Sequence, residues 1–453
     1  MEIHTFEIGF VKSGMNIRQR NKPHEPLSGK ISIPGDKSIS HRAIIFSSMA
    51  IGVSRIDGLL ESDDIISTIN CMKKLGARIS KRKDGIWEVF GVGVGGFSEP
   101  ENIIDLGNSG TSARLISGAV CTSPIKCFFT GDDSLRKRPM DRIIDPLTKF
   151  GADFVAREKS LLPICILGAN DPLGIDFTGK VASAQVKSAV LIAGLNAIGE
   201  TRYIESVHTR DHTERMLSTF GAEVEISQLT DSKCINIKGL AQLDPQEISI
   251  PGDPSSAAFP MCAALMVNGS EITIPNICQN PTRIGLQETL CEMGADISVE
   301  NKRIYGGEPV ADLSVRFGPL RGVSVPPERA PSMIDEYPIL AILASTAEGK
   351  TIMKGIKELR VKESDRIKAV SDGLRQNGIE IEETEDSLTV FGKPGSISGG
   401  SLVKTYYDHR IAMSFLCLDL VAKEPVRVDS LSSINTSFKE FLSSMKKIGA
   451  KFD

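Results

Sequence analysis

The segment ISIPGDKS at residues 31–38 recurs as ISIPGDPS at residues 248–255, and seven of its eight positions are identical. The two copies begin 217 residues apart in a chain of 453 residues. Self-similarity at a fixed distance is typical of chains built from repeated structural units. The pair of segments therefore predicts two homologous halves, each opening with a Pro-Gly turn that is followed by Asp.

A second pattern divides each half further. It consists of an amphipathic run, a Gly, usually an Ala, and then an alternating segment such as AEVEI at residues 222–226. Gly readily adopts the left-handed conformation that ends many helices, and alternation predicts a half-buried strand. The glycines of the six copies are Gly76, Gly151, Gly221, Gly294, Gly378 and Gly449. Their nearly even spacing predicts six helix-and-strand units, three in each half.

The repeats set the expected domain boundaries. We place a first three-unit domain at residues 31–247 and a second at residues 248–453. Residues 1–30 form an N-terminal extension and strand, of which residues 1–28 lie outside the repeat and are predicted to be loose. Met15 is a possible alternative start of the chain.

The composition narrows the class of protein. The 53 Lys and Arg residues against 57 Asp and Glu residues give a formal net charge of −4, which argues against a nucleic-acid coat or an anionic-membrane binder. No stretch approaches the length of a membrane span, and the first ten residues lack the basic region of a secretory signal. The nine cysteines are odd in number and contain no C-x-x-C. The sequence thus predicts a cytoplasmic protein without a disulfide framework or zinc ribbon.

Two motifs suggest chemistry that their surroundings do not support. GVGVGG at residues 91–96 matches G-x-G-x-x-G, but no amphipathic run follows, so a glycine-rich hairpin is favoured over a dinucleotide site. His208 and His212 are spaced like metal ligands on one helix face, but no third histidine lies near. We therefore predict no metal site.

Cationic side chains gather at predicted helix starts. Lys37, Ser38 and Arg42 open an apolar run after the first Pro-Gly turn, and LGNSGTSAR at residues 106–114 precedes another. RKRP at residues 136–139 precedes a third, and Arg366 and Arg410 stand at two further starts. Arginine is unfavourable at a helix N-terminus unless an anion is near, so the set predicts a ligand with two phosphates or carboxylates. A solvated surface run stays open for residues 136–138.

Carboxylates are fewer in these clusters. Asp335 and Glu336 precede a Tyr-Pro, and Glu363 lies within the segment KESDR at residues 362–366. Acids beside lysine and arginine are either ion-paired or, in a closed cationic site, candidate proton carriers.

At these residues the chain resembles the 5-enolpyruvylshikimate-3-phosphate synthase family, the 3-phosphoshikimate 1-carboxyvinyltransferases, and within it the bacterial class II type. The matching stretches run in family order from residue 34 to residue 413, and cover nearly the whole chain. They are PGDKSISHRA, LGNSGTSARL, RKRPMDR, SAQVKSA, TRDHTERM, PSMIDEYP, LRVKESDR and DHRIAM.

The resemblance implies an α/β fold of two similar domains, each built from three βαβαββ units as an inside-out α/β barrel. It also implies that the N-terminal segment belongs with the C-terminal domain. The implied reaction transfers the carboxyvinyl group of phosphoenolpyruvate to the 5-hydroxyl of shikimate 3-phosphate and releases phosphate, in the shikimate pathway to chorismate and the aromatic amino acids. Addition and then elimination pass through a tetrahedral ketal, with no metal and no organic cofactor.

The same resemblance assigns roles to individual residues. The implied catalytic residues are Asp335 as base toward the hydroxyl, Glu363 as acid at the methylene carbon, and Lys37. The implied shikimate 3-phosphate contacts are Lys37, Ser38, Arg42, Ser183, Ala184, Gln185, Arg210, Asp335 and Lys362. The implied phosphoenolpyruvate contacts are Lys37, Gly110, Arg138, Gln185, Arg366 and Arg410.

Two positions qualify this assignment. Many members of the family carry a Lys in the last motif, but Thr436 stands at the equivalent place here, and the contact is not transferred to Lys439. Gly110 is the position at which alanine excludes glyphosate in some relatives, so its glycine predicts a glyphosate-sensitive enzyme.

Two other readings stay open. A sister enolpyruvyltransferase acting on UDP-N-acetylglucosamine shares fold and donor, but it typically uses a loop cysteine, and residues 136–142 contain none. A non-catalytic anion-binding module would gain nothing from Asp335 and Glu363. The expected partners are the two small-molecule substrates, with no nucleic acid and no membrane, and the expected state is a monomer.

Overall fold

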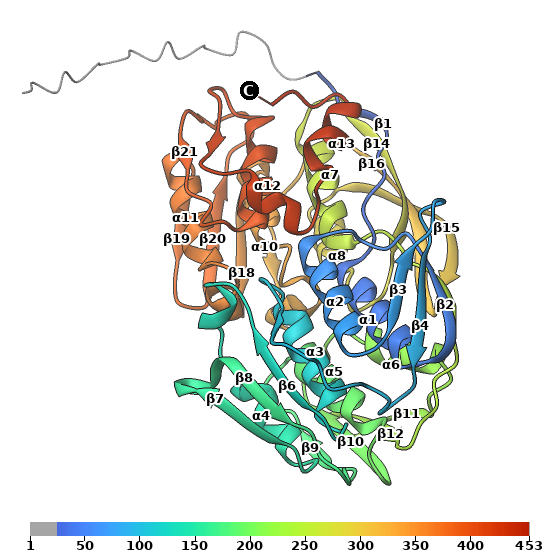
Figure 1. The fold of residues 1–453 in the computed structure, drawn as a ribbon. Coiled ribbons are helices and arrows are strands. Elements are labelled where there is room, and N and C mark those ends of the chain that lie inside the picture. The colour runs from blue at the N-terminus through green and yellow to red at the C-terminus, as the bar shows by residue number, and fades with distance from the viewer. Residues whose placement is uncertain (1–24, 453) are drawn as a thin grey trace, which may run out of the picture.

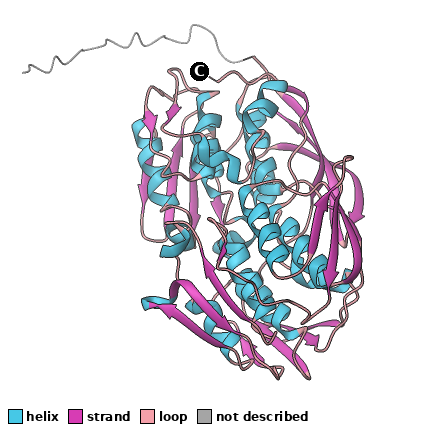
Figure 2. Cartoon of the chain, in the orientation of Figure 1, coloured by secondary structure: helices cyan, strands magenta, loops and turns pink. Residues whose placement is uncertain are grey.

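The computed structural model describes residues 25–452 and contains two separate hydrophobic cores. One core is formed mainly by side chains between Ile39 and Ile250, and the other mainly by side chains between Ala257 and Ala450. The helices lie toward the inside of the molecule and the strands flank them, as Figures 1 and 2 show. Two cores with internal helices agree with the expected pair of similar domains.

The helices and strands have the following bounds. The α-helices are α1 (Lys37–Met49), α2 (Asp63–Lys74), α3 (Gly110–Val120), α4 (Asp141–Thr148), α5 (Ala184–Gly194), α6 (His212–Thr219), α7 (Pro254–Met266), α8 (Gly285–Glu292), α9 (Ala330–Met333), α10 (Tyr337–Thr346), α11 (Arg366–Gln376), α12 (His409–Asp419) and α13 (Phe441–Lys447). The strands are β1 (Ser28–Lys30), β2 (Ile51–Asp57), β3 (Arg78–Lys81), β4 (Trp87–Val92), β5 (Ile104–Asp105), β6 (Lys126–Thr130), β7 (Asp153–Arg157), β8 (Leu161–Leu167), β9 (Asp176–Thr178), β10 (Glu200–Glu205), β11 (Val224–Gln228), β12 (Lys233–Lys238), β13 (Glu247–Ser249), β14 (Glu271–Cys278), β15 (Asp296–Tyr305), β16 (Glu308–Arg316), β17 (Ser324–Val325), β18 (Gly349–Lys354), β19 (Glu380–Glu383), β20 (Ser387–Gly392), β21 (Leu402–Val403) and β22 (Arg427–Val428).

Within residues 25–452, five sheets have four strands each and one has two. The four-stranded orders are β13-β2-β4-β3, β5-β6-β8-β7, β9-β10-β12-β11, β1-β14-β16-β15 and β17-β18-β20-β19. In each of them the first pair is parallel and the other two pairs are antiparallel. In the sheets that begin with β5, β9 and β17, helices between the two parallel strands supply the crossover that such a pair needs, and a hairpin completes the sheet. In the other two sheets the parallel edge strand, β13 or β1, comes from a distant part of the chain. This order confirms the βαβαββ unit.

The glycines that marked the repeat end helices as expected. All six have positive φ values between 84° and 107°, the left-handed region that a side chain disfavours. After α2, the N–H of Gly76 donates to the carbonyl of Lys73, and the N–H of Ala77 donates to that of Met72. The Gly-Ala pair therefore closes the last turn and redirects the chain into β3.

The two copies of the repeated Pro-Gly-Asp segment lie against each other. The N–H of Asp36 donates to the carbonyl of Pro251 at 2.7 Å, and the N–H of Asp253 donates to that of Pro34 at 3.0 Å. Each Asp caps the helix that follows it, since Asp36 accepts from the N–H of Ile39 and Asp253 from that of Ser255. The paired segments therefore place the N-termini of α1 and α7 side by side at the junction of the halves.

The chain crosses between the halves next to this pair. β1 adds in parallel to β14 of the second half, whereas β13 adds in parallel to β2 of the first. Leu27 and Ile31 pack in the second core, and Ile248 and Ile250 in the first. The boundaries at residues 30 and 247 stay predictions. Of the extension, residues 1–24 lie outside the described part of the chain.

The sixth unit differs from the sequence prediction. It contains the parallel pair β21–β22, but no strand follows Gly449 within the described residues 450–452. The N–H of Ala450 closes the end of α13 on the carbonyl of Met445, and the carbonyl of Ile448 accepts from Ser28. The backbone groups around Gly449 thus bond to α13 and to the segment that leads into β1.

One turn near the junction holds two tyrosines in an unfavourable conformation. Tyr406 and Tyr407 have φ values of 53° and 57°, and the N–H of Asp408 closes the turn on the carbonyl of Thr405. Such turns favour Asn-Gly, because positive φ brings a β-carbon too close to the backbone.

We expect Tyr407→Gly to raise the free energy of unfolding by about 1 kcal/mol, since Tyr407 is 78% exposed and gives up little packing. Chemical denaturation of the variant beside the wild type measures this. An unchanged or lower value would contradict the strain argument.

None of the helices among the described residues is both long and apolar enough to cross a membrane.

Candidate active site

Lys37 stands at the first turn of α1, at the junction of the two halves. Its Nζ forms an ion pair with Oδ2 of Asp64, which lies in the first turn of α2. Its backbone N–H points to Oδ2 of Asp253 from the second half, at 3.2 Å. The repeated segment and α2 thus fix both the backbone and the ammonium group of Lys37.

Arg366 holds three carboxylates of the second half together. This guanidinium is 1% exposed, and donates to Oδ1 of Asp335 at 3.2 Å, to Oε2 of Glu363 at 2.6 Å and to Oδ2 of Asp408 at 2.8 Å. Arg366 is the first residue of α11, where the helix dipole disfavours a cation, and the three carboxylates offset that cost. Asp335, the predicted base, and Glu363, the predicted acid, therefore bond to the same guanidinium group.

Two further arginines reach Asp335. Arg210, from the loop before α6 in the first half, donates to Oδ2 of Asp335 at 2.7 Å. Arg410, in the first turn of α12, donates to the backbone carbonyl of Asp335 at 3.4 Å and lies 3.9 Å from Oε1 of Glu336. Residues from both halves therefore meet at Asp335.

The charges around these acids shift their protonation. Burial raises the pKa of Asp335, but the guanidinium groups of Arg410 and Arg210 outweigh burial and hold that pKa well below its usual range. Burial also raises the pKa of Glu363, but Arg366, His409, Arg138 and Lys37 together outweigh burial and hold that pKa well below its usual range. Both carboxyl groups are therefore ionised near neutral pH.

The glycine-rich loop brings a second group of cations into contact. Ser109 caps α3, and Gly110 begins it. Arg138 donates to Oδ1 of Asn108 at 2.7 Å, while Arg114 donates to Oε1 of Gln185 at 2.8 Å. A β-carbon at Gly110 would lie 3.3 Å from Nη1 of Arg138 and 2.9 Å from Nη1 of Arg114. Glycine is therefore what lets both guanidinium groups approach this backbone.

The remaining predicted contacts lie around the starts of α1, α5 and α11. Arg42 is buried and donates to the carbonyl of Ser38 at 2.9 Å; burial lowers the pKa of Arg42 to about 10. Ser183 caps α5, which begins at Ala184. Lys362 lies 3.9 Å from Glu358 and adds to the positive field on Asp335.

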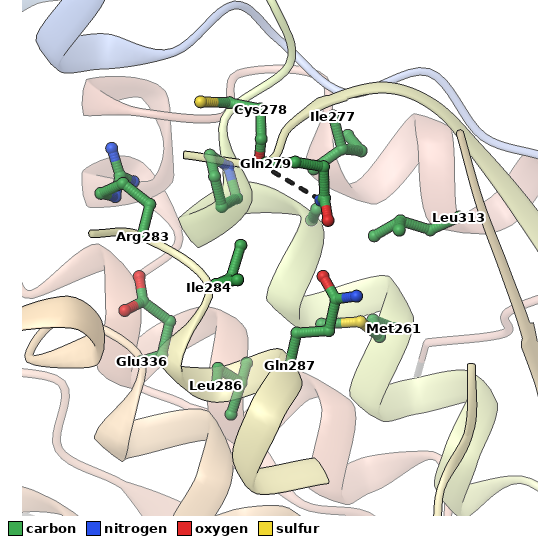
Figure 3. A pocket seen from close by; sticks show the side chains of 12 residues that line it. Met261, Ile277, Cys278, Gln279, Arg283, Ile284, Leu286, Gln287, Leu313 and Glu336 are labelled. Atoms are coloured by element: carbon green, nitrogen blue, oxygen red, sulfur yellow. Dashed lines mark hydrogen bonds between the residues drawn. The ribbon is translucent and has the colours of Figure 1, made fainter. Parts of the chain in front are cut away.

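The cavity shown in Figure 3 lies in the second half, and Glu336, the residue after Asp335, is one of its lining residues. It is partly open to solvent and has an empty volume of about 300 Å³. Apolar side chains such as Met261 and Leu313 line one side, and Arg283 and Glu336 face each other on the other. None of the predicted substrate contacts lines it, so we do not assign it to either substrate.

Sequence reasoning did not assign a role to several side chains that interact with the predicted ones. Among them are Asp64, Asn108, Arg114, Asp408 and His409. Asn108, Arg114, Asp408 and His409 lie inside the quoted motifs, so their signal was present but was not separated from that of their neighbours. Asp64 had no signal beyond an acid in the first turn of a predicted helix.

Thr436 lies beside the site, and Lys439 is exposed. The Oγ1 of Thr436 is 3.2 Å from Nδ1 of His409 and donates to the carbonyl of Ser433 at 2.7 Å.

A buried histidine next to the site makes stability depend on pH. His41 is bonded through Nδ1 to Oγ1 of Thr68 at 2.7 Å, and burial lowers the pKa of His41 to about 3. Below pH ~6.5 the unfolded chain binds a proton that the folded chain does not bind until about pH 3. His41 therefore contributes stability above pH ~6.5 that is lost as the pH falls.

We expect His41→Asn, which keeps a polar partner for Thr68, to lose this dependence. Between pH 6.5 and 5 the wild type should lose about 2 kcal/mol more than the variant, as measured by urea unfolding at each pH. Parallel curves for the two proteins would contradict this assignment.

A sequence model of the EPSP synthase (3-phosphoshikimate 1-carboxyvinyltransferase) family matches residues 21–445 of the chain. The chain is 55% identical over 428 residues to a 3-phosphoshikimate 1-carboxyvinyltransferase of Paracoccus denitrificans, covering 94% of this chain and 96% of that protein. It is 56% identical over 425 residues to that of Cereibacter sphaeroides, covering 94% and 95%.

A solved structure of EPSP synthase from Acinetobacter baumannii has the same architecture. It superposes with a TM-score of 0.85 at 41% sequence identity, and covers 94% of this chain and 97% of that one. The match spans both halves and the junction between them, where the predicted site residues meet. The chain therefore belongs to the EPSP synthase family, as its motifs indicated.

Proposed function

We propose that the chain transfers the carboxyvinyl group of phosphoenolpyruvate to the 5-hydroxyl of shikimate 3-phosphate and releases phosphate. The observation that carries this proposal is the meeting of Arg210 from one half with Asp335, Arg366 and Glu363 from the other. A site with two ionised acids among fixed guanidinium groups suits two anionic substrates and paired proton transfers.

In the addition step, the 5-hydroxyl oxygen bonds to C2 of phosphoenolpyruvate and loses its proton. Asp335 accepts that proton, because neighbouring guanidinium groups keep its carboxyl ionised. Lys37 lies at the junction of the two halves, and in this proposal it contacts both substrates. C3 of phosphoenolpyruvate gains a proton from Glu363, which gives the tetrahedral ketal.

In the elimination step, the C2–O bond to phosphate breaks, Glu363 removes a proton from C3, and the proton that Asp335 took from the hydroxyl leaves with the released phosphate. Glu363 must therefore be protonated before addition, although Arg366 favours its ionised form. A bound phosphate and carboxylate on Arg138, Arg366 and Arg410 would offset those charges and raise the pKa of Glu363. Donor binding and proton loading of Glu363 are thus coupled in this proposal.

The proposed contacts of each substrate come from both halves of the chain. Shikimate 3-phosphate is held by Lys37, Ser38, Arg42, Ser183, Ala184, Gln185, Arg210, Asp335 and Lys362. Phosphoenolpyruvate is held by Lys37, Gly110, Arg138, Gln185, Arg366 and Arg410. We further propose that the enzyme is a monomer in the cytoplasm. We also propose that its reaction uses neither a metal ion nor an organic cofactor.

The test is phosphate release from phosphoenolpyruvate with shikimate 3-phosphate, run beside UDP-N-acetylglucosamine. We expect release only with shikimate 3-phosphate. Release only with UDP-N-acetylglucosamine would assign the sister reaction. If folded protein that still binds phosphoenolpyruvate releases no phosphate with either acceptor, an anion-binding module would be favoured.

Gly110 offers a sharper test of the donor pocket. In Gly110→Ala the new methyl group would press on Arg114 and Arg138, so we expect affinity for phosphoenolpyruvate and for glyphosate to fall by roughly 10–200-fold. Steady-state inhibition of both proteins by glyphosate measures the effect. Wild-type turnover that is unchanged at saturating glyphosate would contradict the expected sensitivity.

A further inference from the structure

Lys187 is a buried cation that the proposed reaction does not use. It lies in the first turn of α5, next to the predicted contacts Ala184 and Gln185, and its side chain is 0% exposed. Its Nζ is 3.0 Å from Oε1 of Glu205 and 2.8 Å from Oε1 of Glu214. A buried charge is costly to desolvate, so such a group needs a reason to be there.

The first partner, Glu205, anchors the loop that carries Arg210. Glu205 ends β10, and its Oε1 accepts from the N–H of Thr209 at 3.0 Å and from its hydroxyl at 2.5 Å. Nζ of Lys187 also lies 3.5 Å from the carbonyl of Thr209. Residues 206–208 are exposed, and Thr209 is buried. Thr209, the residue before Arg210, is therefore the residue through which this loop contacts Glu205 of β10 and Lys187 of α5.

The second partner, Glu214, belongs to α6, which follows the same loop. Its neighbour Thr213 accepts from Nε of Arg42 at 2.8 Å, and Ser188, the neighbour of Lys187, accepts from Nη2 of Arg42 at 2.7 Å. The contact between α5 and α6 thus joins Lys187 to the surroundings of both acceptor-side arginines. Beyond this contact, the guanidinium group of Arg210 donates to Oδ2 of Asp335 at 2.7 Å.

We propose that Lys187 is a positioning residue that sets the place of Arg210, and through it the affinity for shikimate 3-phosphate. Lys187 ties β10, α6 and the carbonyl of Thr209 to the helix that carries the acceptor contacts at its start. This inference rests on the proposed function, because it assigns Lys187 to the acceptor side of that reaction.

The first variant is Lys187→Met in the full chain, which keeps an unbranched side chain and removes the ammonium group. We expect KM for shikimate 3-phosphate to rise by about tenfold or more while KM for phosphoenolpyruvate stays within about twofold. Isothermal titration with shikimate 3-phosphate gives the same comparison without turnover. A folded variant with an unaltered KM would overturn the inference.

A double variant separates positioning from charge balance. Lys187→Met with Glu214→Gln keeps the net charge of the cluster as in the wild type, and leaves the contact between Glu205 and Thr209. We expect it to recover thermal stability relative to Lys187→Met, with KM for shikimate 3-phosphate still raised. Recovery of both stability and KM would show that only the buried charge mattered, and would overturn the proposal.

A cycle with Arg210→Ala tests whether Lys187 acts through Arg210. In that background we expect Lys187→Met to change KM for shikimate 3-phosphate by less than about twofold, since the group to be positioned is gone. An effect as large as in the wild type would contradict action through Arg210.

Lys238→Met is the matched control, because Lys238 pairs with Glu223 on the surface of the same sheet. It should leave both KM values unchanged. A wild type that is inactive with both substrates would remove the proposed function itself, whereas an active wild type with an unaltered Lys187→Met removes only this inference.

Discussion

Glu363→Gln is expected to lower kcat by about 10²–10⁴-fold, the usual range for loss of a general acid-base group. Glutamine keeps the size of the side chain and an oxygen for Arg366, which is 2.6 Å from Oε2 of Glu363. It has no proton to give to C3 and cannot remove one. Binding of phosphoenolpyruvate, measured by fluorescence or calorimetric titration, should therefore be retained.

The matched control is Glu385→Gln, an exposed glutamate that pairs with Lys357 outside the site. Its kcat should equal that of the wild type. If Glu363→Gln kept more than about a tenth of wild-type kcat, proton transfer at C3 would have to be assigned to another group.

Arg366→Met is expected to have the largest effect on stability. The substitution leaves Asp335, Glu363 and Asp408 without the guanidinium that bonds all three. Breaking a buried ion pair by removing one partner costs about 3–5 kcal/mol, and here three acids are left close together. Urea unfolding measures the loss, and KM for phosphoenolpyruvate should rise in the protein that remains folded.

Arg410→Met provides the contrast. Arg410 donates to the backbone carbonyl of Asp335 at 3.4 Å and lies 3.9 Å from Glu336, and it makes no direct ion pair with the Asp335 carboxylate among the described residues, so its loss leaves fewer carboxylates without a bonded partner. We expect a similar rise in KM for phosphoenolpyruvate with a much smaller loss of stability. Equal losses in the two variants would contradict the view that Arg366 combines ligand binding with structural charge balance.

Local chemistry explains why much of the fold was predictable. The six glycines could be recognised because one backbone conformation demands them, and Asp36 and Asp253 because a helix start needs a cap. Arginines at helix starts pointed to anions for a similar reason, and the structure supplies carboxylates to Arg366.

The long-range pairings could not be predicted in the same way. Arg210 and Asp335 are 125 residues apart, and nothing local to either segment specifies the other. In the sequence, Lys187 is a single lysine within an apolar run, which does not indicate a role. Its burial between Glu205 and Glu214 is visible only once α5 is packed against β10 and α6. The sixth unit shows a further limit, because a helix-ending glycine does not ensure that a strand follows it.

The exchange of β1 and β13 between the halves has a consequence for synthesis on the ribosome. β13 emerges directly after the first half and can complete its sheet at once, whereas β1 emerges about 240 residues before β14, its partner. At roughly 5–20 residues per second, β1 stays unpaired for roughly ten to fifty seconds. β1 is therefore made long before it can be paired, and the growing chain carries this strand without its neighbour until β14, near the start of the second half, has been made.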